Sequence, residues 1–208
     1  MANDDRAHLP HARQTHARAQ KIIAIHEAGH AVVARLLGAT VNHVAMFATD
    51  GSWARAGANI EPFMSAATDR DSRIEAAKKD AVIALAGPNA QQKFKPQKFK
   101  VRRGYLPHEW SSDYNHVDWL ILNAAMLETD PTFEVGGNGR TIEPTAEQHT
   151  RAAALFNEAA LKAKSFIEAC WPAIEQTADE LLRRRIIIGD EIDKIMMAAR
   201  RDIEKDPP

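Results

Sequence analysis

Residues Lys21–Gly38 read KIIAIHEAGHAVVARLLG, a stretch that combines a helical pattern with a metal-binding motif. Its apolar residues recur at spacings of three, four and seven, which predicts an α-helix with one buried face. Gly38 follows the last apolar residue, at the point where helices commonly end in a left-handed conformation. His26 and His30 are four residues apart, so their side chains point the same way, one turn apart.

The two histidines are predicted to bind one metal ion, and Glu27 is predicted to act on a water molecule beside it. Zinc accepts imidazole nitrogens at roughly 2.0–2.1 Å, and catalytic zinc sites use three protein ligands and one water. Glu27 follows the first histidine, where a carboxylate can take a proton from a metal-activated water and later deliver it to a leaving amine. His-Glu-x-x-His on a helix is the motif of zinc peptidases.

Composition predicts one globular domain. The chain has 208 residues, of which 45% are hydrophobic and 26% charged, and its net charge of −1 does not favour nucleic acid or an anionic membrane as a partner. We find no apolar run near the roughly 20 residues of a membrane span. We expect a mobile leader over residues 1–14, without the apolar core of a signal peptide, a domain over 15–201, and a frayed tail over 202–208.

A single cysteine limits both redox chemistry and metal chemistry. Cys170 has no partner for an intrachain disulfide, which fits a cytoplasmic location. It also excludes zinc sites built from several cysteines. No histidine and aspartate near Cys170 in the sequence suggest a catalytic nucleophile, so we interpret Cys170 as a structural thiol.

Periodicity and capping signals predict a mainly α (α+β) fold with a small sheet and a C-terminal helical bundle. The strands are expected over residues 41–47 and 56–60. After the first helix, further helices are expected over residues 70–85, 114–128, 146–170, 172–184 and 190–200. Helix starts are marked by Thr68 or Asp69, by the segment Ser111–Asp113 and by the capping box Thr145–Gln148. Gly87 and Pro88 interrupt a helix, with a short helical continuation through Gln92 as the alternative.

The third metal ligand is not given by local spacing. The metzincin pattern requires Gly at position 33 and His at position 36, where this chain has Val33 and Leu36. The thermolysin-like pattern requires a downstream Glu with an Asp four residues later, but Glu75 is followed by Lys79. The remaining option is an isolated carboxylate from a later helix.

Several short motifs, in order, resemble the peptidase domain of the FtsH family of zinc metalloproteases. The matching segments are His26–Ala34 (HEAGHAVVA), Ala84–Ala90 (ALAGPNA), Ser111–Asp113 (SSD), Leu181–Arg184 (LLRR) and Ile188–Ile192 (IGDEI). The resemblance implies a zincin-like helical peptidase domain, Zn²⁺ as cofactor and Asp113 as third ligand. Asp113 can also be a helix N-cap, with its second oxygen on the metal. Asp118, Asp80 and Glu109 are the alternatives.

The chain also departs from that family. The family joins this domain to a membrane anchor and a hexameric ATPase, whereas these residues contain no Walker A motif. Gln91 and Gln92 stand where the family has acidic residues. ATP-dependent degradation is therefore not expected of this chain alone, and coupling to ATP would need a separate ATPase partner.

The expected function is zinc-dependent hydrolysis of peptide bonds in unstructured peptides or flexible protein segments. By the resemblance, the substrate would pair as an added strand with residues 41–47 or 56–60. The alternative is a catalytically silent, metal-stabilised binding or adaptor module, which would have no use for Glu27.

Three further features of the sequence have candidate functional roles. The basic segment Lys93–Arg103 (KFKPQKFKVRR) can contact phosphates, although we favour a solvated loop. His108 and His116 flank Asp113 and are candidates for orienting it or for stabilising an oxyanion. Trp110 is a candidate for lining a substrate pocket.

Overall fold

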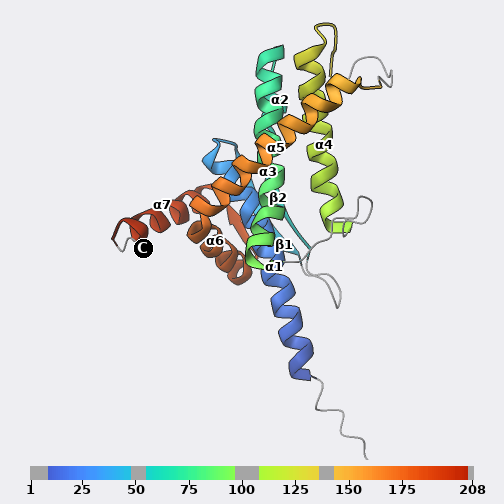
Figure 1. Ribbon diagram of the computed structural model, residues 1–208. Coiled ribbons are helices and arrows are strands. Elements are labelled where there is room, and N and C mark those ends of the chain that lie inside the picture. Colours follow the sequence, from blue (N-terminus) through green and yellow to red (C-terminus); the bar gives the residue numbers. More distant parts are fainter. Residues whose placement is uncertain (1–8, 48–54, 97–107, 136–142, 206–208) are drawn as a thin grey trace, which may run out of the picture.

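The computed structural model describes residues 9–47, 55–96, 108–135 and 143–205, and these form mainly helices with one small sheet (Figure 1). This confirms the mainly helical class predicted from the sequence. The elements in chain order are α1 Leu9–Leu36, β1 Val41–Phe47, β2 Arg55–Ile60, α2 Phe63–Ala66, α3 Arg70–Phe94, α4 His108–Thr129, α5 Ala146–Ala169, α6 Trp171–Arg184, β3 Ile186–Ile188 and α7 Gly189–Lys205.

Helix α1 carries the His-Glu-x-x-His motif through the centre of the fold. It begins at Leu9, within the segment 1–14 predicted as a mobile leader, and residues 1–8 lie outside the described residues. The first turns of α1 project away from the other helices in Figure 1. Its second half is buried, with Ile25 and Val32 fully inaccessible. Gly38 ends the helix at φ +87°, as the sequence predicts.

The sheet contains three antiparallel strands in the order β2-β1-β3. Val44 at the middle of β1 pairs with Ala58 on one side and Ile187 on the other. Val44 and Ile187 are buried on the side of the sheet that packs on the helices. The sequence predicted β1 and β2 but not β3, because a run of three isoleucines is too short to show a strand period.

Helix α3 passes through Gly87 and Pro88, so the predicted interruption is wrong. Pro88 has no N–H to donate to the carbonyl four residues earlier, which ordinarily disfavours a helix interior. Here the segment is held by packing: Ala86 and Ala90 beside it are fully buried. The side chain of Asn89 also donates to the carbonyl of Leu85 at 2.7 Å. Tertiary contacts therefore outweigh the local signal.

Asp69 begins α3 as predicted. Its side chain accepts a hydrogen bond from the backbone N–H of Ser72 at 2.9 Å, and the Ser72 hydroxyl lies 3.1 Å from the N–H of Asp69. This reciprocal pair is a capping box.

Helix α4 begins at His108, so Asp113 lies inside the helix and the N-cap prediction for it is wrong. The sequence between His108 and Asp113 contains neither Gly nor Pro, and Pro107, just before it, is a residue that favours helix starts. Arg70, at the start of α3, donates to the carbonyls of Leu127 and Asp130 at the end of α4. The two helices therefore run antiparallel, and the later turns of α3 face the turn that carries Asp113.

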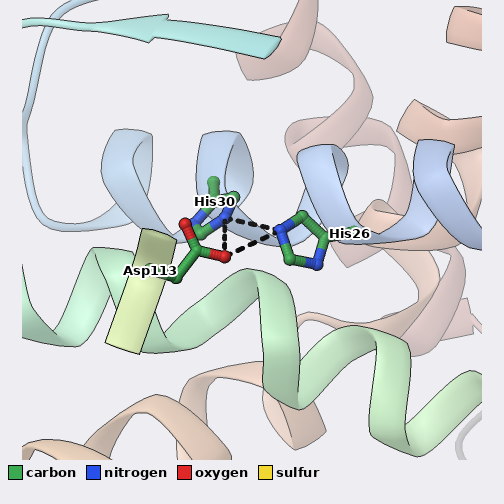
Figure 2. A group of neighbouring side chains, drawn as sticks. All are labelled: His26, His30 and Asp113. Atoms are coloured by element: carbon green, nitrogen blue, oxygen red, sulfur yellow. Dashed lines mark hydrogen bonds and ion pairs between the residues drawn. The ribbon is translucent and has the colours of Figure 1, made fainter. Parts of the chain in front are cut away.

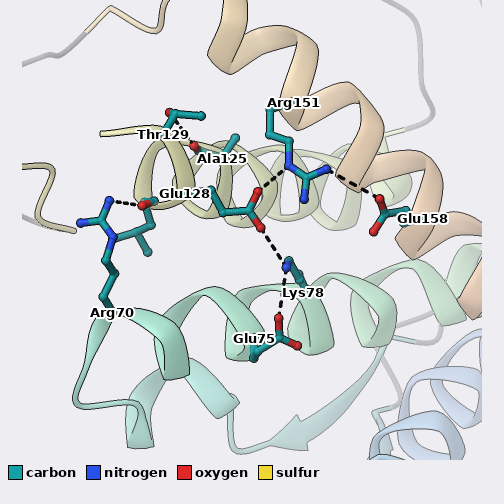
Figure 3. Close-up of polar contacts among 9 residues, drawn as sticks. Arg70, Glu75, Lys78, Ala125, Glu128, Thr129, Arg151 and Glu158 are labelled. Carbon is teal, nitrogen blue, oxygen red and sulfur yellow. Dashed lines mark hydrogen bonds and ion pairs between the residues drawn. The ribbon is translucent and has the colours of Figure 1, made fainter. Parts of the chain in front are cut away.

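A charged network fixes α3, α4 and α5 relative to one another (Figure 3). Glu128 of α4 lies at its centre, 2.9 Å from the Lys78 ammonium and in contact with the Arg151 guanidinium. Lys78 also contacts Glu75 at 3.1 Å, and Arg151 lies 3.8 Å from Glu158. Burial alone would raise the pKa of Glu128, but hydrogen bonds from Arg151 and Lys78 lower it overall.

The C-terminal helices pack on the N-terminal ones. Helix α5 lies against α3 and α4, and α6 lies against α1. Thr145 and Gln148 form the predicted capping box at the start of α5, and α6 begins at Trp171, one residue before its predicted start. Helix α7 continues to Lys205, beyond the end near residue 200 that the sequence predicts. No helix in the described ranges has the length and apolarity to span a membrane.

Candidate metal centre

Side chains from α1 and α4 converge at one point (Figure 2). The Nε2 atoms of His26 and His30 are 3.0 Å apart. Oδ2 of Asp113 lies 3.1 Å from Nε2 of His26 and 3.7 Å from Nε2 of His30. The side chains are only 13%, 11% and 21% exposed, respectively. The structure thus brings together the three residues named from the sequence and its family resemblance.

Hydrogen bonds to α3 fix the orientation of both imidazole rings. Nδ1 of His30 lies 2.8 Å from the carbonyl oxygen of Ile83, which can only accept, so this nitrogen carries the hydrogen. Nδ1 of His26 lies 3.0 Å from Oε1 of Gln91 and donates to it in the same way. In the neutral rings both Nε2 atoms therefore present lone pairs.

These three convergent atoms need a positive charge among them. Two imidazole lone pairs and a carboxylate oxygen are all acceptors, and Asp113 Oδ2 is buried without a hydrogen-bond donor. Burial raises the pKa of Asp113, but the two histidine rings lower it far below its usual range. Burial also disfavours the charged form of His30 and so lowers its pKa, but the hydrogen bond and charge of Asp113 raise that pKa overall. The site therefore favours a cation, either a shared proton or a metal ion.

The geometry fits a zinc-sized ion. In a tetrahedral zinc site, ligand atoms at 2.0–2.1 Å from the metal are roughly 3.3–3.4 Å from one another. The three observed separations of 3.0, 3.1 and 3.7 Å bracket that value. Two imidazole nitrogens with one carboxylate oxygen are also a known donor set of catalytic zinc sites. His26, His30 and Asp113 could therefore hold a metal ion.

Small residues let α3 approach the site closely. A Cβ atom added to Gly87 would lie 2.2 Å from Nε2 of His30, on the edge of the ring that faces His26 and Asp113. One added to Gly29 would lie 2.7 Å from Cβ of Ala90. Both distances are far below van der Waals contact. The absence of a side chain at Gly87 thus keeps the ligand-binding edge of His30 open.

Glu27 follows His26 directly on α1. It is half-buried on α1, and its negative charge contributes to raising the pKa of His30. In the part of the chain that the structure describes, no hydrogen-bond or ion-pair partner engages its carboxylate. The group is therefore available to exchange a proton with a molecule bound at the centre.

The alternative ligands lie elsewhere or outside the described side chains. Asp80 is buried, but its two oxygens accept the N–H groups of Phe63 and Met64, each at 3.0 Å, so it caps α2. Asp118 is exposed on α4. The side chain of Glu109 lies outside the described residues, as do those of the sequence candidates His108 and Trp110.

Two further sequence candidates take structural roles. His116 stacks on Trp119, with ring centroids 6.2 Å apart, and is not part of the ligand group. Within the basic segment, Lys93 pairs with Glu168 and lies 5.1 Å above the Trp171 ring, while residues 97–103 lie outside the described ranges.

The contribution of α3 to the metal centre was not predicted from the sequence. Ile83, Gly87 and Gln91 are spaced four residues apart and so form one stripe on α3. This stripe supplies the acceptor for His30, the space beside its ring and the acceptor for His26. The spacing was visible, but its meaning depends on where α1 crosses α3.

No family model and no curated protein sequence matches this chain. The relationship to FtsH peptidases therefore remains an expectation drawn from short motifs.

Replacing Asp113 with alanine is expected to weaken zinc binding at least tenfold. Loss of groups that only orient ligands costs about 10–100-fold in affinity, and loss of a ligand should cost no less. Competition with a chromophoric zinc chelator measures the change. Asp118→Ala, on an exposed turn of the same helix, is the matched control and should bind like the unmodified protein. Undiminished affinity in Asp113→Ala would remove Asp113 from the site.

Proposed function

We propose that this protein is a zinc-dependent metallopeptidase. His26, His30 and Asp113 hold Zn²⁺, and Glu27 is the general base. The observation that carries the proposal is the convergence of three acceptor atoms 3.0–3.7 Å apart beside a carboxylate without a partner among the described residues. A purely structural metal site has four protein ligands and no need of an adjacent base.

Each protein group has a defined task in this reaction. When bound, zinc supplies Lewis-acid chemistry, lowering the pKa of a water molecule and polarising the scissile carbonyl. Glu27 accepts the proton of the attacking water, holds it on its carboxylate and delivers it to the leaving amine nitrogen. Ile83 and Gln91 keep both Nε2 atoms aimed at the centre through the hydrogen bonds at Nδ1.

The sheet supports extended, unstructured segments as substrates. Among the described strands, β2 pairs only with β1, so its outer edge has main-chain groups for one more strand. A peptide added there gains main-chain hydrogen bonds largely independent of its sequence. A folded substrate cannot offer such a strand without unfolding, so a folded protein would need a separate ATPase partner.

Removal of the metal tests the proposal. Cleavage of a fluorescently labelled disordered protein by the purified chain is expected to stop on dialysis against a zinc chelator. One equivalent of Zn²⁺ per chain should restore it, because one group of ligands is present in the described structure. Circular dichroism before and after chelation separates loss of the reaction from loss of the fold. Cleavage that continues unchanged without metal contradicts the proposal.

A further inference from the structure

A second feature lies beside the metal centre: a cavity of about 480 Å³ between α2, α3 and α4. Its lining includes Arg73 and Asp80 of α3, His116 and Trp119 of α4, and Met64 of α2. Sites for small ligands commonly have volumes of about 300–1,000 Å³. The cavity is therefore large enough for one amino-acid side chain or chain terminus.

The cavity begins about one helical turn from Asp113 on α4 and from Ile83, the hydrogen-bond partner of His30, on α3. On α4, His116 comes three residues after Asp113, which places the two on neighbouring turns of one face. On α3, Asp80 comes three residues before Ile83, whose carbonyl accepts from His30. Three residues of helix span about 4.5 Å. Arg73 comes seven residues before Asp80, about 10 Å further along α3, so a peptide held at the metal centre can place in this cavity a group a few residues away from the scissile bond.

The charges of the lining favour an anion. Arg73 is half-buried, and its guanidinium has no hydrogen-bond or ion-pair partner among the described residues. Asp80 is already engaged by the N–H groups of Phe63 and Met64 and makes no ion pair with Arg73. A guanidinium always carries its charge and binds carboxylates through two parallel hydrogen bonds. The lining thus combines a carboxylate whose two oxygens are already hydrogen-bonded with a guanidinium that has no ion-pair partner among the described residues and can receive a carboxylate.

The remaining walls favour an organic anion over a small ion. The stacked rings of His116 and Trp119 and the Met64 side chain give an apolar surface beside the guanidinium. The cavity lining is more apolar than polar, which suits a carboxylate carried on a methylene stem or a peptide.

We propose that this cavity is a specificity site for a substrate carboxylate a few residues away from the scissile bond. The carboxylate comes either from an Asp or Glu side chain or from the free C-terminus of the peptide. This inference rests on the proposed peptidase function, but it makes a separate statement about which peptides bind.

Peptide binding tests the inference without requiring turnover. Zinc-loaded Glu27→Gln protein is titrated into four fluorescein-labelled decapeptides of one unstructured sequence. They carry Glu or Gln at the centre and a free or amidated C-terminus, and binding is followed by fluorescence anisotropy. We expect one of the two carboxylates to strengthen binding about tenfold, as charge-assisted hydrogen bonds do. The pair that shows the difference identifies the source of the carboxylate.

Reversal or removal of the Arg73 charge is the second test. Arg73→Glu and Arg73→Met, each made in the Glu27→Gln protein, should abolish the preference for the carboxylate. Arg201→Glu makes the same charge change as Arg73→Glu at an exposed position of α7 and should preserve the preference. Equal binding of all four peptides, absence of binding, or an equal effect of Arg201→Glu would overturn the inference.

Cleavage by protein with intact Glu27 separates the two proposals. Carboxylate-dependent binding without cleavage would overturn the peptidase function and leave the cavity assignment standing. Cleavage by a protein that shows no carboxylate preference in binding would overturn the cavity assignment and leave the peptidase function standing.

Discussion

Glu27→Gln is expected to lower kcat for peptide cleavage about 10²–10⁴-fold, the usual contribution of a general acid–base group. Glutamine has nearly the same shape as glutamate but cannot take a proton from water at neutral pH. Glu27 is not one of the three convergent residues, so zinc should remain bound in the variant. Steady-state kinetics on an unstructured substrate, with zinc content measured by mass spectrometry on the same samples, gives both values.

A matched control separates the local chemistry from a general loss of charge. Glu175 is also half-buried and lies on α6, outside the convergent group. Glu175→Gln should leave kcat and zinc content unchanged. If Glu27→Gln retains full activity with zinc bound, the hydrolase proposal fails. If the unmodified protein binds zinc but cleaves nothing, the alternative of a metal-stabilised binding module is favoured.

The sequence could predict those residues of the metal centre that lie close together in the chain. His26, Glu27 and His30 lie within one helical turn, so their spacing alone specifies their relative positions. Asp113 is far along the chain, and spacing could not distinguish it from Asp80, because the choice depends on the antiparallel packing of α3 on α4. The family resemblance favoured Asp113, and the geometry places it beside both histidines.

The misjudged elements share a physical cause. Pro88 predicts a helix end locally, but burial of its neighbours against α1 holds the helix through it. Ile186–Ile188 forms a strand only because β1 offers a partner. Gln91 was noted only as a departure from a family pattern, whereas its contact with His26 requires knowing where two helices cross. Long-range packing decides each of these, and no short window of sequence contains it.

Gly87→Ala is expected to lower the affinity for zinc at least tenfold, comparable to loss of a ligand. The new Cβ atom would lie 2.2 Å from Nε2 of His30 and 2.6 Å from its Cδ2. Helix α3 cannot withdraw easily, because Ala86 and Ala90 are fully buried beside this position. The imidazole must therefore turn away, which also breaks its hydrogen bond to Ile83.

The same substitution should leave the fold largely intact, which makes the result informative. Alanine is a better helix former than glycine by about 1 kcal/mol, offsetting part of the local strain. Gly57→Ala in β2 is the matched control, since an added Cβ there meets no atom within 4 Å. Chelator competition and thermal unfolding of both variants give the comparison. Zinc affinity in Gly87→Ala equal to that of Gly57→Ala would mean that His30 binds no metal at this position, because no ligand ring can share its coordinating edge with a methyl group.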